Sequence, residues 1–464
     1  MKDYTTQQRQ RSEQEISWDH PLIGEEWDQV VDLVLVDLEE TAREENALQR
    51  RREVRSAKDL LRLVLAYALC DWSLRLVAAW ATIKGLCCIS DVALRKRLRA
   101  ARKWLGRLVT TCLLPNQMAL ALPDVQLRIV DATSISRPGS SGTDWRVHLS
   151  FNLGQLRLDA VEVTDVHGGE SLARFSLQPG EIILGDRGYA RRPALGLALE
   201  AEHQLVIRIG WRTLPLQDDE EGTSLDLLAW LRKIPASGPL QRSVWVETPR
   251  GTCALRLIAC RLPQQAVEQA RRRIRRQASR KGRTPRKGTL EAAAFFMVVT
   301  NLPEGTWKAE QVLELYRIRW QVEIAIKRLK SIWHLDHLRA KDVDLAQTYL
   351  LGKLLGALVG DALTGKVRDC LPAWFGDLFR PVSLWRLHCF WFEWIHRAVV
   401  GRISLDAILK ALPRLQRYLR DPLRKKRRQQ LAYALDWIQK LSSAADQRAS
   451  LTIPASMEYE MVQS

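Results

Sequence analysis

The stretch 315–330 reads LYRIRWQVEIAIKRLK, and it carries polar groups where an amphipathic core helix would be apolar. Tyr316, Arg319, Glu323 and Lys330 follow one another at intervals of three, four and seven residues. These intervals place all four side chains on one face of a helix. The face therefore presents a phenol, a guanidinium, a carboxylate and an ammonium group.

The apolar neighbours of this polar face are Trp320, Ile324 and Leu329, which predict that the helix is partly buried. The plain alternative is an exposed helix in which Arg319 and Glu323 form an ion pair four residues apart. A half-buried polar stripe more often marks a functional site than a solvated surface. We therefore interpret the stretch as part of a site.

Two acidic residues upstream follow apolar runs that are typical of buried strands. Asp131 follows residues 127–130, and Asp186 follows residues 181–185. A single aspartate at such a position is usually a turn or cap residue. A carboxylate held on a buried strand costs desolvation free energy unless it is neutralised. Hard divalent cations such as Mg²⁺ or Mn²⁺ neutralise it well, and a pair of them about 4 Å apart can promote attack on a phosphodiester.

The pattern Y-x2-R-x3-E-x6-K in 316–330 resembles the signature of the DDE transposases of the IS-four family. These are bacterial insertion-sequence enzymes, and the Tn-five transposase is a relative. The blocks VDAT (130–133) and GDRGYA (185–190) resemble the family's two aspartate blocks. TDWRVH (143–148) and VVTNLP (298–303) also fit, so that the resemblance covers about residues 55–340.

The resemblance implies an α/β fold with an RNase H-like catalytic core at residues 121–340 and a mainly β insertion at about 211–308. The residues themselves agree, because short β-branched runs begin after Pro115 and predict three neighbouring strands, a fourth strand, a helix at 192–202 and a fifth strand. Helical patterns flank this block on both sides.

The resemblance also implies the roles of the site residues. Asp131, Asp186 and Glu323 would be the catalytic carboxylates that bind Mg²⁺, with Mn²⁺ as a substitute. The phosphates near the cleaved transposon end would be held by Tyr316, Arg319 and Lys330.

The implied chemistry begins with hydrolysis of a phosphodiester at the transposon end. The freed 3′-OH then attacks the opposite strand, which gives a hairpin, or target DNA. Hairpin-forming relatives place a Trp in the insertion, where this chain has Phe295 and Phe296, so the route stays open. Two alternatives also stay open: an RNase H-like nuclease without strand transfer, and a catalytically silent DNA-binding protein.

The charge of the chain points to a polyanionic partner. The 464 residues include 71 Lys and Arg against 53 Asp and Glu, a formal charge of +18. Such an excess favours DNA, RNA or an anionic membrane. Residues 1–50 differ from the rest of the chain, because they hold 5 basic and 13 acidic side chains and are net negative. This segment is predicted to be an acidic helical leader. A hydrophobic content of 46% excludes wholesale disorder.

Residues 51–120 are predicted to be a helical DNA-binding region. A short helix, a turn at Gly85 and a second helix capped by Ser90 outline a helix-turn-helix, although a bundle with a solvated basic face fits equally well. The candidate DNA-binding residues on the second helix and just after it are Arg95, Arg97, Arg99, Arg102 and Lys103.

Two further basic stretches stand out. Ten of the 17 residues in 271–287 are Lys or Arg, and Ser279, Gly282 and Pro285 predict a solvated loop or a mobile phosphate-contacting arm instead of a helix. Residues 341–464 are predicted to be helical, basic at 414–428, and to support a homodimer in the DNA complex.

The remaining expectations concern location. Charged residues interrupt the most apolar stretches, so we expect no membrane span. The N-terminus has no apolar signal region, and the eight cysteines have no CxxC spacing. These features predict a cytoplasmic protein, associated with the bacterial nucleoid when it acts on DNA.

Overall fold

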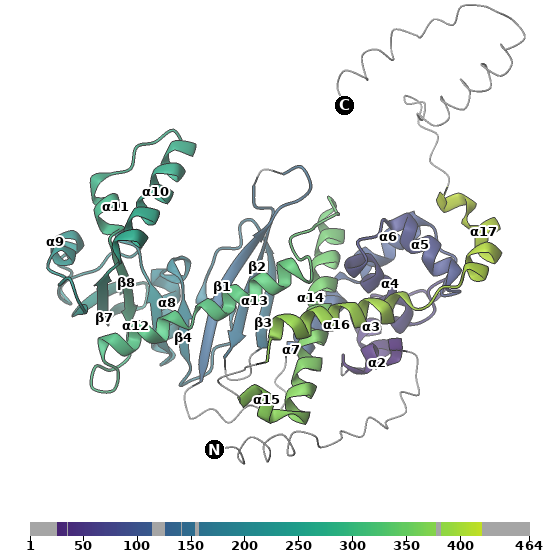
Figure 1. The fold of residues 1–464 in the computed structure, drawn as a ribbon, viewed down its shortest axis with the longest axis horizontal. Coiled ribbons are helices and arrows are strands. Elements are labelled where there is room, and N and C mark those ends of the chain that lie inside the picture. Colours follow the sequence, from purple (N-terminus) through teal and green to yellow (C-terminus); the bar gives the residue numbers. More distant parts are fainter. Residues whose placement is uncertain are drawn as a thin grey trace, which may run out of the picture. The chain divides into compact units, whose positions relative to one another are not determined.

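The computed structural model describes residues 26–34, 36–113, 126–140, 142–153, 157–376 and 382–419. The alternating runs after residue 126 form one eight-stranded sheet in the order β3-β2-β1-β4-β5-β8-β7-β6 (Figure 1). The strands are β1 (Leu127–Ile135), β2 (Trp145–Asn152), β3 (Arg157–Asp165), β4 (Ile182–Gly185), β5 (Gln204–Arg208), β6 (Pro239–Thr248), β7 (Gly251–Arg261) and β8 (Phe295–Thr300).

The first five strands form the core of the sheet. β2 pairs antiparallel with both β1 and β3, whereas β1, β4 and β5 are parallel neighbours. Two 3₁₀ turns, η1 (Leu172–Arg174) and η2 (Arg187–Tyr189), flank β4, and helix α8 (Arg192–Glu200) connects it to β5. This mixed α/β arrangement confirms the predicted RNase H-like fold class.

The segment between β5 and the signature helices extends the same sheet. β8 pairs antiparallel with β5, β7 with β8, and β6 with β7. The segment also contains the helices α9 (Leu227–Arg232), α10 (Gln264–Arg280) and α11 (Lys287–Ala292). The inserted segment, expected to be mainly β, therefore combines strands and helices.

The basic stretch 271–287 was expected to be a loop or a mobile arm, and that prediction is wrong for its first part. Residues up to Arg280 belong to the long helix α10. Alanine, glutamine and arginine are good helix formers, and they outweigh Ser279, which lies in the last turn. Gly282 ends the helix with a positive φ of 60°, and Pro285 lies beyond that end.

Helices precede the sheet, and side-chain caps define where they begin. Ser56 and Ser90 accept hydrogen bonds from Asp59 and Ala93, as N-caps do. The predicted turn at Gly85 is present, with φ at +68°. The helices are α2 (Glu26–Asp32), α3 (Leu38–Glu44), α4 (Ala57–Leu69), α5 (Leu74–Ile83), α6 (Asp91–Ala100) and α7 (Arg102–Leu113).

The acidic leader is described only from residue 26 onward, and the prediction for residues 1–25 lies outside the described residues. The described part forms two short helices, α2 and α3. Trp27 and Val30 of α2 are buried. Asp37 is the N-cap of α3, and its side chain accepts a hydrogen bond from the Glu40 amide.

The signature stretch and the helices after it complete the described chain. These helices are α12 (Ala309–Arg317), α13 (Trp320–Ser331), α14 (Val343–Cys370), α15 (Pro372–Gly376), α16 (Leu384–Val400) and α17 (Leu405–Leu419). Two compact units divide the chain, 1–412 and 413–464. The expectations for residues 420–464, including most of the basic run 414–428, lie outside the described residues.

Helix α14 packs against the N-terminal helices through a row of small residues. A Cβ atom on Gly352 would lie 2.7 Å from the Ala68 Cβ, and one on Gly360 would lie 2.8 Å from the Trp333 ring. The absence of a side chain on Gly352 lets the α14 backbone approach α4 closely, whereas Gly360 makes room for the Trp333 ring from the turn after α13.

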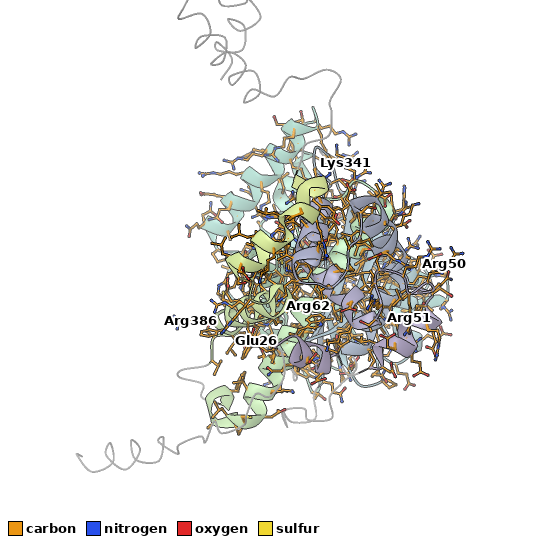
Figure 2. The ribbon with its side chains drawn as sticks, turned by 90° about the vertical axis from the view of Figure 1, so that its right-hand side faces the viewer. Glu26, Arg50, Arg51, Arg62, Lys341 and Arg386 are labelled. Carbon is orange, nitrogen blue, oxygen red and sulfur yellow. The ribbon has the colours of Figure 1, made fainter. Side chains whose placement is uncertain are left out.

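Arg62 joins the N-terminal helices to the end of α16. It is buried and donates hydrogen bonds to the carbonyls of Val399 and Ala398 at 2.9 and 3.3 Å. Figure 2 shows Arg62 in the helical region, with Arg50 and Arg51 at its outer edge. Throughout the described ranges, no helix combines the length and the apolar character that crossing a membrane requires.

Candidate active site

Asp131 lies in the middle of β1, directly after a fully buried stretch of that strand. Its side chain is 17% exposed and accepts a hydrogen bond of 2.8 Å from the Ala132 amide. Asp186 is the first residue after β4, where it caps η2 by accepting a hydrogen bond of 2.7 Å from the Gly188 amide.

The register of the two parallel strands brings these aspartates together. Ile129 of β1 pairs with Leu184 of β4, and each aspartate follows its paired residue by two positions. Because side chains alternate with a period of two, Asp131 and Asp186 lie at the same level of the sheet and on the same face. The sequence predicted that both acids lie on or after buried strands. The pairing of β1 with β4 shows in addition that the two acids are neighbours.

Glu323 reaches the same face from α13, which packs on β1 and β2. The signature stretch was expected to be one helix, but it forms two, with a break between Arg317 and Trp320. Arg319 is the N-cap residue of α13, and Tyr316 lies in the last turn of α12. The break is local, since the Arg319 guanidinium still lies 5.7 Å from the centre of the Tyr316 ring.

Arg319 connects two of the three carboxylates. Its Nη1 donates to Asp131 Oδ2 at 3.2 Å, and its Nη2 donates to Glu323 Oε1. The guanidinium is only 13% exposed. The i,i+4 ion pair that offered the plain interpretation is therefore present, but it is shared with a strand carboxylate and partly buried, unlike a pair on a solvated helix.

Lys330 is placed differently from the other signature residues. It lies on the same helical face as Glu323 but about 10 Å further along the axis of α13. It makes no hydrogen bond or ion pair with the part of the chain that the structure describes. Trp320, which was expected to help bury the helix, is 60% exposed, whereas Leu329 is 4% exposed.

The electrostatics of the site follow from burial beside like charges. Burial raises the pKa of Asp131 to about 6, the nearby Asp186 and Glu323 add to the effect, and Arg319 opposes it. Burial also raises the pKa of Tyr316 to about 12, so its hydroxyl stays protonated. That hydroxyl has no hydrogen-bond partner among the described residues.

One residue that sequence reasoning missed, Arg208, completes the site. Arg208 ends β5, and burial beside Arg187 lowers its pKa. Its guanidinium lies over the ring of Phe296 at 5.1 Å, and that ring is 5.3 Å from the Tyr316 ring. A cation at the end of the buried run HQLVIRIG is the only local signal for Arg208.

Phe295 and Phe296, noted at the position of the relatives' Trp, therefore differ in role. Phe295 is buried in the core below Arg261, whereas Phe296 is half-buried and lines the site beside Tyr316. The aromatic ring that borders the site is thus Phe296.

The donor set suits a hard divalent cation. Asp131, Asp186 and Glu323 offer only carboxylate oxygens, which Mg²⁺ and Mn²⁺ prefer. Among the described residues, however, no three His, Cys, Asp or Glu side chains converge in a metal-binding geometry. The Arg319 guanidinium provides positive charge between Asp131 and Glu323. The residues fit the ion chemically, and Arg319 partly neutralises them.

The predicted DNA-binding residues on α6 and α7 separate into two groups. Arg99 and Arg102 form ion pairs with Asp344 of α14, and Arg97 donates to the Arg50 carbonyl. The side chains of Arg95 and Lys103 are exposed and make no ion pair or hydrogen bond with other described residues. α4, α5 and α6 contact one another pairwise, as the helices of a helix-turn-helix do.

The mixed sheet, with Asp131 on β1, Asp186 after β4 and Glu323 on a helix packed across β1 and β2, is an RNase H-like fold. Comparison with known proteins gives the family. Residues 123–359 match the family described as "Transposase DDE domain". The chain belongs to the DDE transposase family, as the signature resemblance predicted, and it is an enzyme that acts on DNA. A DDE domain implies a divalent metal ion.

Several relatives show how far the similarity extends. The chain is 38% identical over 343 residues to the putative transposase InsL for insertion sequence element IS186A of Escherichia coli (strain K12), covering 72% of this chain and 92% of the relative. It is equally identical over 344 residues to the transposase for insertion sequence element IS421 of Escherichia coli, with the same coverage. The transposase for IS231F of Bacillus thuringiensis subsp. israelensis is 32% identical over 116 residues, 25% of this chain and 24% of the relative.

Proposed function

We propose that this chain is the transposase of a bacterial insertion sequence, which cuts at the terminal inverted repeats of its element and joins the freed 3′-OH ends to target DNA. The observation that supports it best is the placement of Asp131 and Asp186 two residues beyond a β1–β4 pair, with Glu323 joined to Asp131 through Arg319. One reaction centre can use all three.

Asp131, Asp186 and Glu323 would hold Mg²⁺, or Mn²⁺ in its place. When bound, the cation supplies activation of water or of the 3′-OH and stabilises the leaving oxygen. Arg319 and Arg208 would orient the scissile phosphate with charge-assisted hydrogen bonds, and the protonated Tyr316 would donate another. Lys330 would bind a phosphate further along the strand, as its position two turns beyond Glu323 suggests.

We propose that α4–α6 recognise the element ends. α6 follows the helix-turn-helix order, and its exposed Arg95 and Lys96 are free to contact DNA. Arg99 and Arg102 are better assigned to positioning α6 against α14, because both already pair with Asp344. This assignment narrows the DNA-contacting set to Arg95, Lys96 and the exposed Lys103.

The domain organisation that accompanies this function is 1–50 as leader, 51–120 for DNA binding, 121–340 for catalysis with the insertion at about 211–308, and 341–464 for support of a homodimer. Synapsis of two ends requires at least two active sites, which favours a dimer in the DNA complex. The bacterial relatives and a polyanionic DNA substrate support action in the cytoplasm, on nucleoid DNA.

The test incubates the purified chain with a labelled duplex carrying one end of its element, a target plasmid and Mg²⁺ or Mn²⁺. We expect cleavage at the end and joining to the plasmid, both abolished in Asp186→Asn and kept in the exposed-acid control Glu310→Gln. Cleavage without joining would instead indicate a nuclease. Specific binding without cleavage in either metal would indicate a silent DNA-binding protein.

A further inference from the structure

The most strongly charged feature outside the catalytic site is the helical hairpin formed by α10, the turn 281–286 and α11. Ten of the 17 residues in 271–287 are Lys or Arg, and none is Asp or Glu. Figure 1 shows α10 and α11 projecting together beyond the ends of β7 and β8. Val267 is the only residue of α10 that is buried, so most of the helix surface faces solvent.

Most of these cations have no protein partner in the described part of the chain. Arg271 donates its Nε to the Leu290 carbonyl at 2.9 Å, and the other nine basic side chains make no hydrogen bond or ion pair with described residues. Like charges four residues apart on a helix, such as Arg272 and Arg276, destabilise it by about 0.2–0.5 kcal/mol per pair. The exposed face of α10, opposite the half-buried Ile274 and Ala278, carries Arg272, Arg273, Arg275 and Arg276. This face destabilises the helix through its own charges unless an anion lies against it.

The α10–α11 hairpin is connected to β7 and β8 at the end of the sheet where Asp186 lies. β8 runs antiparallel to β5, and β5 runs parallel to β4, so the start of β8 lies at the same end of the sheet as the end of β4, which Asp186 follows. Arg261, the last residue of β7, pairs with Phe295, the first of β8. β7 therefore ends, and β8 begins, at the same end of the sheet as Asp186.

A chain of direct contacts connects the hairpin base to the site. Phe296, the second residue of β8, lies 5.3 Å from the Tyr316 ring and under the Arg208 guanidinium at 5.1 Å. A duplex positioned by its scissile phosphate at Asp131 and Asp186 would continue past this edge of the sheet. α10, with 17 residues, is about 25 Å long, which is comparable with most of one turn of a duplex, about 34 Å.

We infer that the α10–α11 hairpin is a clamp that binds the phosphate backbone of the duplex held at the catalytic carboxylates, without reading its sequence. The inference rests on the proposed function for the identity of that duplex. The partner is duplex DNA, because a row of guanidinium groups along a straight helix matches closely spaced phosphates and because binding releases condensed counterions. The occupied hairpin would then hold DNA that α6 does not reach.

The test measures binding of two equally long fluorescent duplexes, one carrying the element end and one unrelated, by anisotropy across a salt series with Ca²⁺ in place of Mg²⁺. The variant replaces Arg272, Arg273, Arg275 and Arg276 with Gln. We expect weaker binding of both duplexes and a slope of log K against log salt that becomes less negative by about 0.9 for each phosphate that the variant no longer neutralises. Circular dichroism checks that the variant stays folded.

Two matched controls separate a clamp from a general reduction of charge. The same four positions changed to Lys keep the charge and should keep most of the affinity and the slope. A second control changes four cations elsewhere, Lys366, Arg386, Arg397 and Arg402, to Gln, and it should leave the slope close to that of the unmodified chain. An unchanged slope in the hairpin variant, or an equal change in the second control, would overturn the inference.

The inference and the proposed function can fail separately. If the Gln variant binds and cleaves like the unmodified chain, the clamp is refuted while the transposase assignment stands. If the unmodified chain cleaves nothing in Mg²⁺ or Mn²⁺ but the slopes differ as expected, the clamp stands and the proposed function is refuted. A poly-glutamate chain that competes as well as duplex per unit charge would show a general polyanion surface and overturn the assignment to DNA.

Discussion

Arg319 Nη1 donates to Asp131 Oδ2 at 3.2 Å, so a residue that the signature assigns to phosphate binding is paired with an acid that the signature assigns to catalysis. The same guanidinium also pairs with Glu323. These contacts compensate part of the cost of holding two carboxylates in a partly buried position. They also mean that Arg319 has to exchange partners when a cation and a phosphate enter the site.

The first prediction concerns this exchange. Arg319→Gln removes a positive charge that competes with a divalent cation for Asp131 and Glu323. We expect the DNA-free variant to bind Mn²⁺ more tightly, by about tenfold, which corresponds to one pKa unit of interaction. Isothermal titration calorimetry measures the affinity. The exposed neighbour Arg317, changed to Gln, serves as the control and should leave the affinity near its original value. Weaker binding in Arg319→Gln would show that the arginine supports the ion instead of competing with it.

The second prediction concerns the carboxylate itself. Asp131→Asn keeps the shape of the side chain but removes its charge, so we expect DNA cleavage to fall by more than about a hundredfold, since even outer partners of metal ligands contribute roughly 10–100-fold. Gel analysis of labelled DNA measures the rate. Binding of the duplex in Ca²⁺ should persist, because the basic surfaces are untouched. Loss of even an outer partner of a metal ligand lowers the rate by about 10–100-fold. If Asp131→Asn still cleaves within about threefold of the original rate, Asp131 is not a catalytic residue.

The third prediction is a pH dependence of stability that comes from a buried lysine outside the site. Lys353 of α14 is 2% exposed and donates to the carbonyls of His334 and His337 in the turn after α13. Burial lowers its pKa to about 8, against the opposing effects of Asp71 and Asp336.

The direction of this effect follows from proton binding. Between pH 8 and the ordinary lysine value near 10.4, the unfolded chain holds a proton on Lys353 that the folded chain has released, so the free energy of unfolding rises with pH in this window. Relative to Lys353→Met, the original chain should become more stable by about 1–2 kcal/mol between pH 7 and 9.5. Urea unfolding of both proteins at the two pH values measures the difference. A difference that stays constant with pH would contradict the lowered pKa.

The fourth prediction uses two glycines of the same helix. Gly352→Ala would place a methyl group 2.7 Å from the Ala68 Cβ, where α14 and α4 meet, so we expect a destabilisation of about 1–3 kcal/mol from overpacking. Gly365→Ala meets its nearest atom only at 3.9 Å, and it should instead stabilise the chain by up to about 1 kcal/mol through helix propensity. Thermal or urea unfolding compares the two. Equal effects would mean that the close approach of the helices relaxes without cost.

The strands, and the placement of Asp131 and Asp186 on or after them, could be predicted from sequence because both depend on local patterns; the catalytic role of the acids stays a prediction. Alternation with a period of two predicted β1 and β4, and the signature spacing located Glu323. Their adjacency came from strand register, which the local pattern does not contain. The break before α13 falls at Ile318 and Arg319, and neither residue is a helix breaker such as proline or glycine. The sequence therefore predicts one continuous helix.

Other features required tertiary information. Arg208 and Phe296 are 88 residues apart in the chain and meet only because β8 pairs antiparallel with β5. The periodicity of the sequence does not show which strands pair with each other. α10 was mistaken for a loop because Ser279 and Gly282 were weighed as breakers, although they act only at its end. Similarly, the ion pairs of Arg99 and Arg102 with Asp344 join residues more than 240 positions apart.

The eight strands form a single hydrogen-bonded ladder that passes from β3 to β6 without a gap. The insertion and the catalytic core therefore share one hydrogen-bonded sheet. Closing the insertion over bound DNA like a jaw would require breaking the antiparallel pairs between β5 and β8, each a buried backbone contact. DNA that contacts both the insertion and the core would therefore meet one continuous surface.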